Sequence, residues 1–281
     1  MSAPAFSDEE FRLWSEWLAA EYGLAFGPQR RDLLRTRLEP RRAALGLESF
    51  EQLFFHLRYH PEAEAERQRL LPHLTNNESY FLRERGSLEV LRAEVLPALR
   101  ARLGATGELR LLSAACAAGE EAYTLAAVAR ESGLFRWPSQ VRVTGLDLDP
   151  AALERARAGC YGEHAFRGVE PAWRRAWFTE RARCAEVRPA LRAVTVFQQA
   201  NLVQPGWWSA LPPPQVIFCR NVLIYFSEPA VRCAAEALYA ALAPGGYLFL
   251  GHAESLRHVP VPFTVERRPG ALFYRKPEAP R

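Results

Sequence analysis

The stretch Leu109-Arg-Leu-Leu-Ser-Ala-Ala-Cys-Ala-Ala-Gly-Glu-Glu121 decides the fold class of this 281-residue chain. Its apolar first part, 109–115, predicts a buried strand, and a helix is expected from about Glu120 to Ser132. Small residues and Gly119 fill the turn between them, which lets the backbone approach a ligand closely. A strand, a tight turn and a helix in this order predict the start of a parallel α/β sheet.

The chain beyond this segment repeats the alternation of strand and helix. Further strands are predicted at 141–146, 194–198, 215–219 and 247–250. Asp149 and Pro150 predict the start of a helix that ends at Gly159. The runs 263–265 and 271–275 predict a final antiparallel hairpin. We therefore expect an α/β fold with a Rossmann-like, doubly wound sheet and an antiparallel C-terminal hairpin.

The first 74 residues contain no strand signal. Trp14, Leu18 and Tyr22 recur at helical spacing, and Gly and Pro residues divide this part into roughly four helices. The polar stretch 75–79 follows it. We expect a small all-helical domain over residues 1–74 and the α/β domain over residues 75–281.

Composition limits the location and the partners of the protein. No run of 18 apolar residues is present, and the N-terminus lacks the features of a signal peptide, so we expect a cytoplasmic protein without direct membrane insertion. The net charge of +4 and the pI of about 8.9 are mildly basic. Such a charge can attract nucleic acid, an anionic membrane or an acidic protein, and by itself it does not choose among them.

Neither the cysteines nor the histidines indicate a metal site or a disulfide framework. The five cysteines are odd in number and form no Cys-x-x-Cys pair, which favours reduced and mostly buried thiols. His56 and His60 lie one helical turn apart, but no third ligand accompanies them. We interpret them as part of a solvated helix face and expect no metal.

Polar residues follow several of the predicted strands. Glu120 and Glu121 follow the first strand, Asp147 the second, and Arg220 and Asn221 the strand at 215–219. Ligands of open α/β sheets bind at this edge. The first turn lacks Gly-x-Gly-x-x-Gly, and its acids repel phosphate but suit a cationic ligand such as S-adenosylmethionine. The paired acids can equally stabilise the helix dipole, so the turn alone is ambiguous.

Six motifs occur in an order that resembles one known family. They are Asn77-Glu-Ser-Tyr-Phe-Leu-Arg-Glu84, Ser113 to Tyr123, Leu146-Asp-Leu-Asp149, Asn201-Leu202, Ile217-Phe-Cys-Arg-Asn-Val-Leu-Ile-Tyr-Phe226 and Gly251-His-Ala-Glu-Ser255. Along nearly its whole length the sequence resembles the CheR family, the chemotaxis-receptor glutamate O-methyltransferases. Ser79, Leu82 and Ala122 depart from the usual residues but remove no polar group that the site needs.

The resemblance implies a cofactor, S-adenosylmethionine, which becomes S-adenosylhomocysteine in the reaction. Glu121 then pairs with the methionine ammonium, Asp147 with the ribose hydroxyls and Asn201 with the adenine edge, while Leu202 packs on the ring. The complete set of implied cofactor contacts is Asn77, Ser79, Arg83, Ala115, Glu121, Asp147, Asn201, Leu202, Arg220 and Asn221.

Two residues are the candidates for the catalytic role that the resemblance implies. Arg83 can orient the carboxylate of the substrate, since a planar guanidinium matches two oxygens. The alternative for Arg83 is a salt bridge to Glu84 or a neighbouring helix. Tyr225 can hydrogen-bond beside the transferred methyl, and its alternative is a core tyrosine bonded to backbone.

The resemblance also implies the partner, the cytoplasmic helices of methyl-accepting chemoreceptors. Arginines at 30, 31, 35, 37, 41 and 42 give the N-terminal domain a basic face that can dock on acidic receptor helices, or they form a solvated face. We expect no nucleic-acid partner and a monomer. The family has a small antiparallel subdomain, here within 161–200, which in some members binds a receptor peptide. Its hairpin looks shortened, so no tethering peptide is expected.

Two other functions stay open from the sequence. One is a methyltransferase of the same fold that acts on a different protein or on a small molecule. The other is a cofactor-binding sensor without catalysis, against which the presence of Arg83, Glu121, Asp147, Asn221 and Tyr225 argues.

Overall fold

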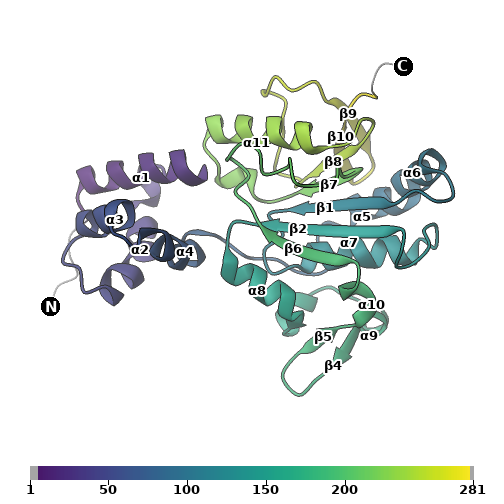
Figure 1. Cartoon of the computed structure of the whole chain (residues 1–281), viewed down its shortest axis with the longest axis horizontal. Coiled ribbons are helices and arrows are strands. Elements are labelled where there is room, and N and C mark those ends of the chain that lie inside the picture. Colours follow the sequence, from purple (N-terminus) through teal and green to yellow (C-terminus); the bar gives the residue numbers. More distant parts are fainter. Residues whose placement is uncertain (1–5, 279–281) are drawn as a thin grey trace.

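The computed structural model describes residues 6–278, so the outer ends of the two predicted domains, 1–5 and 279–281, lie outside the described residues (Figure 1). The N-terminal part is formed by α1 (Asp8–Tyr22), α2 (Arg31–Ala44), α3 (Phe50–Tyr59) and α4 (Ala63–Leu74). Ser7 and Glu10 form a capping box that fixes the start of α1. Trp14, Leu34 and Phe50 are buried where the helices meet. No helix of residues 6–278 combines the length and apolar character needed to cross a bilayer.

The main sheet has seven strands and confirms the predicted α/β class. Its strands are β1 (Leu109–Ala114), β2 (Val141–Asp147), β6 (Thr195–Gln199), β7 (Val216–Cys219), β8 (Tyr247–Leu250), β9 (Thr264–Arg268) and β10 (Ala271–Arg275). The order is β6-β2-β1-β7-β8-β10-β9. The first five are parallel, and β10 pairs antiparallel with both β8 and β9. The carboxyl ends of β1, β2 and β7 therefore meet at one edge, on either side of the point where the chain reverses direction across the sheet.

Helices cover both faces of this sheet (Figure 1). One face packs against α5 (Arg85–Val90), the π-helical turn Leu91–Val95, α6 (Leu96–Leu103) and α7 (Glu120–Glu131), and the other packs against α11 (Glu228–Ala241). Neighbouring residues of a strand point to opposite faces. Leu111 thus lies in the first core and Leu112 in the second. The predicted N-cap of α8 (Pro150–Ala158) is confirmed, because the Asp149 carboxylate accepts from the Ala151 N–H at 2.8 Å.

A second, three-stranded antiparallel sheet follows α8. It contains β3 (Cys160–Tyr161), β4 (Phe178–Glu180) and β5 (Ala185–Val187) in the order β3-β5-β4. The short helices α9 (Pro171–Trp177) and α10 (Pro189–Arg192) flank it. A connection of four residues, 181–184, joins β4 to β5.

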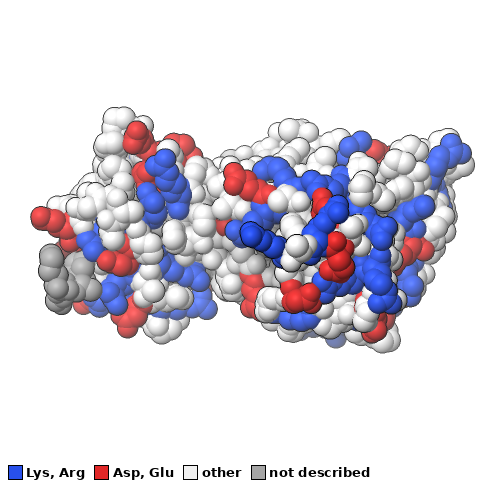
Figure 2. All heavy atoms as spheres, turned by 90° about the horizontal axis from the view of Figure 1, so that it is seen from below, with Lys and Arg blue, Asp and Glu red and all other residues white. Residues whose placement is uncertain are grey.

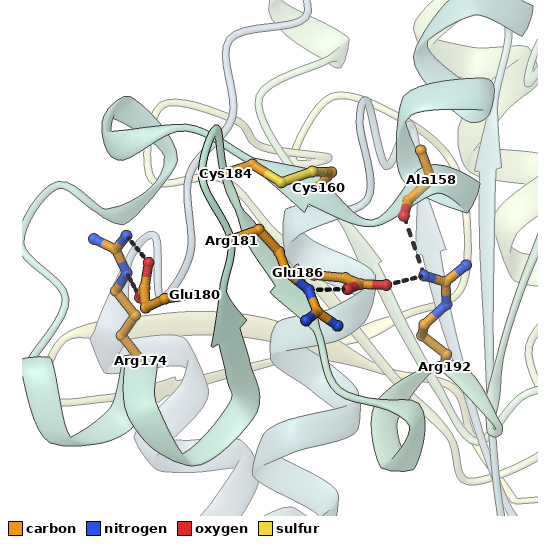
Figure 3. The surroundings of a disulfide bond; sticks show 8 residues. All are labelled: Ala158, Cys160, Arg174, Glu180, Arg181, Cys184, Glu186 and Arg192. Carbon is orange, nitrogen blue, oxygen red and sulfur yellow. Dashed lines mark hydrogen bonds and ion pairs between the residues drawn. A yellow bond between two sulfur atoms is a disulfide. The ribbon is translucent and has the colours of Figure 1, made fainter.

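The reading of all cysteines as reduced thiols is wrong for one pair. Cys160 and Cys184 form a disulfide between the start of β3 and the β4–β5 connection, with their Cα atoms 5.6 Å apart (Figure 3). The pairing of β3 with β5 brings these residues together across 24 positions of sequence. A short sequence motif cannot reveal a contact between residues that are so far apart in the sequence. Cys116 and Cys219 are free and buried, whereas Cys233 is free and exposed.

The helical part is joined to the sheet part by backbone pairing as well as by the chain. Leu24 and Phe226 form an antiparallel bridge. Beside it the Ala25 N–H donates to the carbonyl of Tyr225, and the Ser227 N–H donates to that of Gly23, both at 2.8 Å. Gly23 has a φ of +75°, and a Cβ there would lie 2.9 Å from that of Ala230 on α11. The close approach of α1 to α11 thus depends on this glycine.

Candidate cofactor and active site

A cavity of about 340 Å³ lies at the carboxyl ends of β1, β2 and β7 and extends to the helical domain. The structure brings all the predicted cofactor-binding residues and the candidate catalytic Tyr225 to its wall: Asn77, Ser79, Arg83, Ala115, Glu121, Asp147, Asn201, Leu202, Arg220, Asn221 and Tyr225. Tyr22, Phe26, Arg30, Leu33 and Arg37 of the helical domain form the opposite wall. The individual roles of these side chains toward a ligand stay predictions.

Asp147 is the last residue of β2 and is held rigidly by backbone groups. Its carboxylate accepts from the Ala117 N–H at 2.8 Å and from the Asp149 N–H at 2.9 Å. The residue is only 7% exposed, and burial raises its pKa from 3.8 to about 6. A buried carboxylate at the cavity wall can accept hydrogen bonds from ribose hydroxyls, as the sequence predicts.

The raised pKa of Asp147 predicts a pH dependence of ligand binding. Between about pH 4 and pH 6 Asp147 is protonated in the folded protein but ionised in the unfolded chain. The contribution of Asp147 to the stability of the free protein therefore decreases as the pH rises through that window. A ligand that needs the carboxylate binds better as the pH rises through 6. We expect calorimetry to show about tenfold weaker cofactor binding at pH 5 than at pH 7. In Asp147→Asn this pH dependence should disappear, and an unchanged dependence would assign it to another group.

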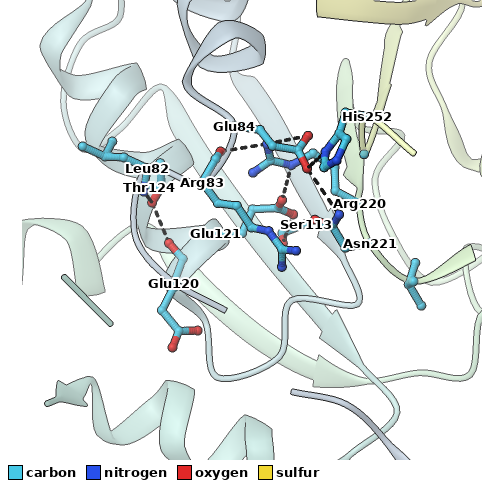
Figure 4. Close-up of polar contacts among 12 residues, drawn as sticks. Leu82, Arg83, Glu84, Ser113, Glu120, Glu121, Thr124, Arg220, Asn221 and His252 are labelled. Carbon is cyan, nitrogen blue, oxygen red and sulfur yellow. Dashed lines mark hydrogen bonds and ion pairs between the residues drawn. The ribbon is translucent and has the colours of Figure 1, made fainter. Parts of the chain in front are cut away.

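A chain of polar contacts connects the strand ends beside the cavity (Figure 4). The Ser113 hydroxyl donates to one Glu121 oxygen at 2.7 Å, and Arg220 Nε donates to the other at 2.7 Å. Arg220 Nη1 also lies 3.7 Å from a Glu84 oxygen. Glu84 in turn contacts His252 Nδ1 at 3.0 Å. This network fixes Glu121 at the wall, where its carboxylate can meet an ammonium group.

The two adjacent acids of α7 have different surroundings. Glu121 lines the cavity, whereas the side chain of Glu120 points away from the Glu121 cluster (Figure 4). Burial raises the pKa of Glu120, although a hydrogen bond to Ser79 acts in the opposite direction. One Glu120 oxygen is buried without a hydrogen-bond partner. The resemblance assigned Glu121, and not Glu120, to the cofactor, and only Glu121 of the two lines the cavity.

The two candidate catalytic side chains have free hydrogen-bonding groups. Arg83 Nη1 donates to the Glu78 carbonyl at 3.0 Å, and its guanidinium lies 5.5 Å from the Tyr80 ring. Among the described residues Arg83 makes no ion pair, so the alternative of a salt bridge to Glu84 is not found. The phenol oxygen of Tyr225 accepts from Asn76 Nδ2 at 2.7 Å, which leaves its own proton available.

Two predicted cofactor residues also connect the domains. Asn77 Nδ2 donates to the buried Asp149 carboxylate at 2.5 Å, so the linker is anchored to the end of β2. Asn201 Nδ2 donates to the Glu21 carbonyl at 2.8 Å, and its Oδ1 accepts from the Val203 N–H. The Asn201 amide is thus partly engaged in structural bonds, which leaves one N–H and one lone pair of Oδ1 for an adenine edge.

Sequence reasoning assigned no role to Asn76, Ser113, Glu84 or Glu254. Asn76 directly precedes the Asn77–Glu84 motif, and Glu84 is its last residue. Ser113 and Glu254 lie inside two of the other motifs. The motifs therefore contained a signal for these residues. Their roles depend mostly on partners that are distant in the sequence, up to the 149 positions that separate Asn76 from Tyr225.

The fold and the cavity define a class of protein. The parallel sheet ends in a cavity whose buried carboxylates suit ribose hydroxyls and an ammonium group, and the unpartnered Oδ1 of Asn221 offers a further acceptor. This set of acceptors fits the ribose hydroxyls and the ammonium of S-adenosylmethionine, and the fold and the cavity together define a methyltransferase that uses it. The family model described as "CheR methyltransferase, SAM binding domain" matches residues 77–270. The family model described as "CheR methyltransferase, all-alpha domain" matches residues 9–75. The chain belongs to the CheR methyltransferase family.

Curated relatives resemble the chain over most of its length. A probable chemotaxis protein methyltransferase of Rhizobium etli is 33% identical over 239 residues, which are 84% of this chain and 88% of that protein. Chemotaxis protein methyltransferase 1 of Pseudomonas aeruginosa is 31% identical over 277 residues, 96% of this chain and 99% of that protein. A solved TehB-like SAM-dependent methyltransferase of Corynebacterium glutamicum is 15% identical and covers 77% of this chain and 96% of its own, with a TM-score of 0.37.

Proposed function

We propose that this enzyme transfers the methyl group of S-adenosylmethionine to glutamate side chains of chemoreceptors. The products are glutamate methyl esters and S-adenosylhomocysteine. The single observation that carries the proposal is the shared cavity. The acidic residues that we propose to bind the cofactor line it together with Arg83 and Tyr225. Membership of the CheR family and the names of the relatives support it.

The main task of the protein in this reaction is to align the substrate carboxylate with the methyl group of the cofactor. The cofactor supplies an electrophilic methyl group on a sulfonium, and a glutamate carboxylate, with an ordinary pKa of about 4.3, is already ionised at neutral pH. No strong base is required. Arg83 orients the two oxygens of the substrate carboxylate, Tyr225 donates a hydrogen bond next to it, and the walls of the cavity exclude water. Arg83 also supplies positive charge that favours the binding of an acidic side chain in a cavity lined by Glu121 and Asp147.

The activity is tested with methyl-labelled cofactor and cytoplasmic fragments of chemoreceptors. Glutamate methyl esters hydrolyse in alkali, so the label should be released as methanol. Label that is incorporated but resists alkali supports the alternative, a methyltransferase acting on other groups or molecules. Cofactor binding without any transfer supports a sensor.

We predict that Arg83→Ala lowers kcat about 100-fold in this assay, because a positioned charged donor contributes about two to three orders of magnitude to such a reaction. Arg83 also lines the cofactor cavity, so we expect cofactor affinity to fall much less than kcat. The control is Arg92→Ala, which removes an exposed arginine of the adjacent helix and should leave kcat unchanged. If Arg83→Ala keeps its kcat, another group orients the substrate.

The docking of the receptor is proposed on α2, beside the mouth of the cavity. The helical domain is not basic overall, since residues 1–74 contain ten arginines and twelve acidic residues. Four of the six arginines of the predicted basic face make internal bonds: Arg31 to Asp8, Arg37 to the Leu74 carbonyl, Arg41 to Glu66 and Arg42 to Glu39. Arg30 and Arg35 make no such bond within the described residues. Arg30 lines the cavity together with Leu33, and an acidic receptor helix laid across α2 would meet both.

Positive charge gathers elsewhere on the molecule. Residues 151–200 contain nine arginines and five glutamates, and Figure 2 shows many basic side chains on this underside, where α8, α9 and the small sheet lie.

The short β4–β5 connection supports the proposal that no tethering receptor peptide is used. We further propose domains over 1–74 and 75–281 with 161–200 as an insertion, and a monomeric enzyme acting in the cytoplasm.

A further inference from the structure

The motif Gly251-His-Ala-Glu-Ser255 places a buried carboxylate beneath the loop that follows β7. Glu254 is only 8% exposed. Its Oε2 accepts from the N–H groups of Asn221 at 2.8 Å and Gly251 at 2.7 Å. Its Oε1 accepts from those of Val222 at 2.8 Å and Leu223 at 2.7 Å. One side chain thus collects four backbone donors, three of them consecutive along the loop.

The loop needs this anion because of its backbone conformation. Asn221 has a φ of +59°, which is the left-handed region that a residue with a side chain rarely adopts. Successive N–H groups around such a residue converge and form a concave anion-binding nest. Glu254 fills this nest from within the protein. A carboxylate of the substrate therefore cannot use these N–H groups and has to be oriented by side chains.

The same loop carries groups of the cavity. Asn221 Nδ2 donates to Glu84 at 3.2 Å, while its Oδ1 is buried without a partner although the residue lines the cavity. The short 3-10 turn Leu223–Tyr225 begins with Leu223, whose N–H is the third one bound by Glu254. It ends with Tyr225, whose phenol is the candidate catalytic group. Glu254 itself does not line the cavity. Its effect on a ligand is therefore transmitted through Asn221 and Tyr225.

We infer that Glu254 is a positioning residue, which holds Asn221 in its left-handed conformation so that Oδ1 receives a donor of the cofactor, and sets the place of Tyr225. The inference rests on the proposed function in that the cavity holds S-adenosylmethionine. It does not depend on which substrate receives the methyl group. It gives the Gly251–Ser255 motif a role in the active site.

The test uses two variants of the full chain and S-adenosylhomocysteine as the probe in calorimetry. Glu254→Gln keeps the size of the side chain but turns an NH₂ group toward backbone donors. Gly251→Ala keeps the charge, yet its Cβ would lie 2.7 Å from Glu254 Oε2 and 2.9 Å from Asn221 Nδ2, so it displaces the same contact. We expect both variants to bind the probe at least about tenfold more weakly. Both should also lower kcat in the methyl-transfer assay and leave the KM for the receptor fragment unchanged.

Glu66→Gln is the matched control for loss of stability alone. Glu66 is 2% exposed and pairs with Arg41 in the helical domain, away from the cavity wall. It should lower the melting temperature without changing the affinity for the probe. If Glu254→Gln does not fold, Gly251→Ala decides. Folded variants with wild-type affinity and kcat would overturn the inference, whereas wild-type protein that binds the probe but methylates no receptor would overturn only the proposed substrate.

Discussion

Asp147→Ala is expected to abolish cofactor binding in calorimetry. We propose that this carboxylate accepts hydrogen bonds from both hydroxyls of a ribose, and each hydrogen bond to a charged group contributes about 1.5–3 kcal/mol. The loss of both corresponds to an affinity at least about 100-fold lower. No neighbouring acid can substitute, because the Asp149 carboxylate already accepts from Asn77 and from the Ala151 N–H.

The alanine variant also removes an acceptor from the Ala117 and Asp149 N–H groups, so the fold has to be checked separately. Thermal unfolding of the free protein measures that contribution. Glu154→Ala removes an exposed carboxylate of α8 and serves as the control, with unchanged binding. Wild-type affinity in a folded Asp147→Ala protein would rule out the ribose role.

Arg220→Met is expected to have the largest effect on stability. The Arg220 side chain is 2% exposed and is the shared counter-charge of Glu121 and Glu84. Although burial raises it, the pKa of Glu84 is held below its usual range by His252, Arg220 and Asn221. Removing one partner of a buried pair leaves an uncompensated charge and costs about 3–5 kcal/mol. In a protein of this size that corresponds to a melting temperature lower by roughly 10 °C.

A double variant separates this charge effect from lost packing. Arg220→Met combined with Glu121→Gln removes one of the unpaired charges and should recover part of the stability in thermal unfolding. Arg275→Met, on the half-exposed C-terminal strand, is the control and should change the melting temperature little. If the double variant is no more stable than Arg220→Met, electrostatic pairing is not what Arg220 contributes.

The sequence predicted the main sheet well because its signals are local. The central strands β1, β7 and β8 are short and mostly apolar runs, and Asp149 and Pro150 mark the start of α8 by side-chain chemistry that acts over two residues. The polar residues that follow the strands were predictable for the same reason, whereas Asn77, Arg83 and Tyr225 were predicted from the resemblance to the family. Parallel strands must end at one edge, so Asp147 and Arg220 had to lie near each other once the sheet was assumed.

The parts that the sequence missed depend on contacts between distant residues. The Cys160–Cys184 disulfide needs the register of β3 with β5, and Glu254 needs the loop 221–223 folded against it. The arginines of α2 look alike in the sequence, yet Arg41 is committed to a buried glutamate whereas Arg35 is not. Local pattern gives the type of a residue, and only the packed structure decides its partner.

The backbone bridge between Leu24 and Phe226 limits how this enzyme can be rebuilt. The seam between the two parts passes through Tyr225, whose carbonyl accepts from Ala25 while its phenol faces the cavity. The helical domain is therefore not an exchangeable module. A chimera that takes this domain from a relative should therefore take the 23–25 turn and the 225–227 segment from the same protein, so that the backbone bonds across the seam are kept.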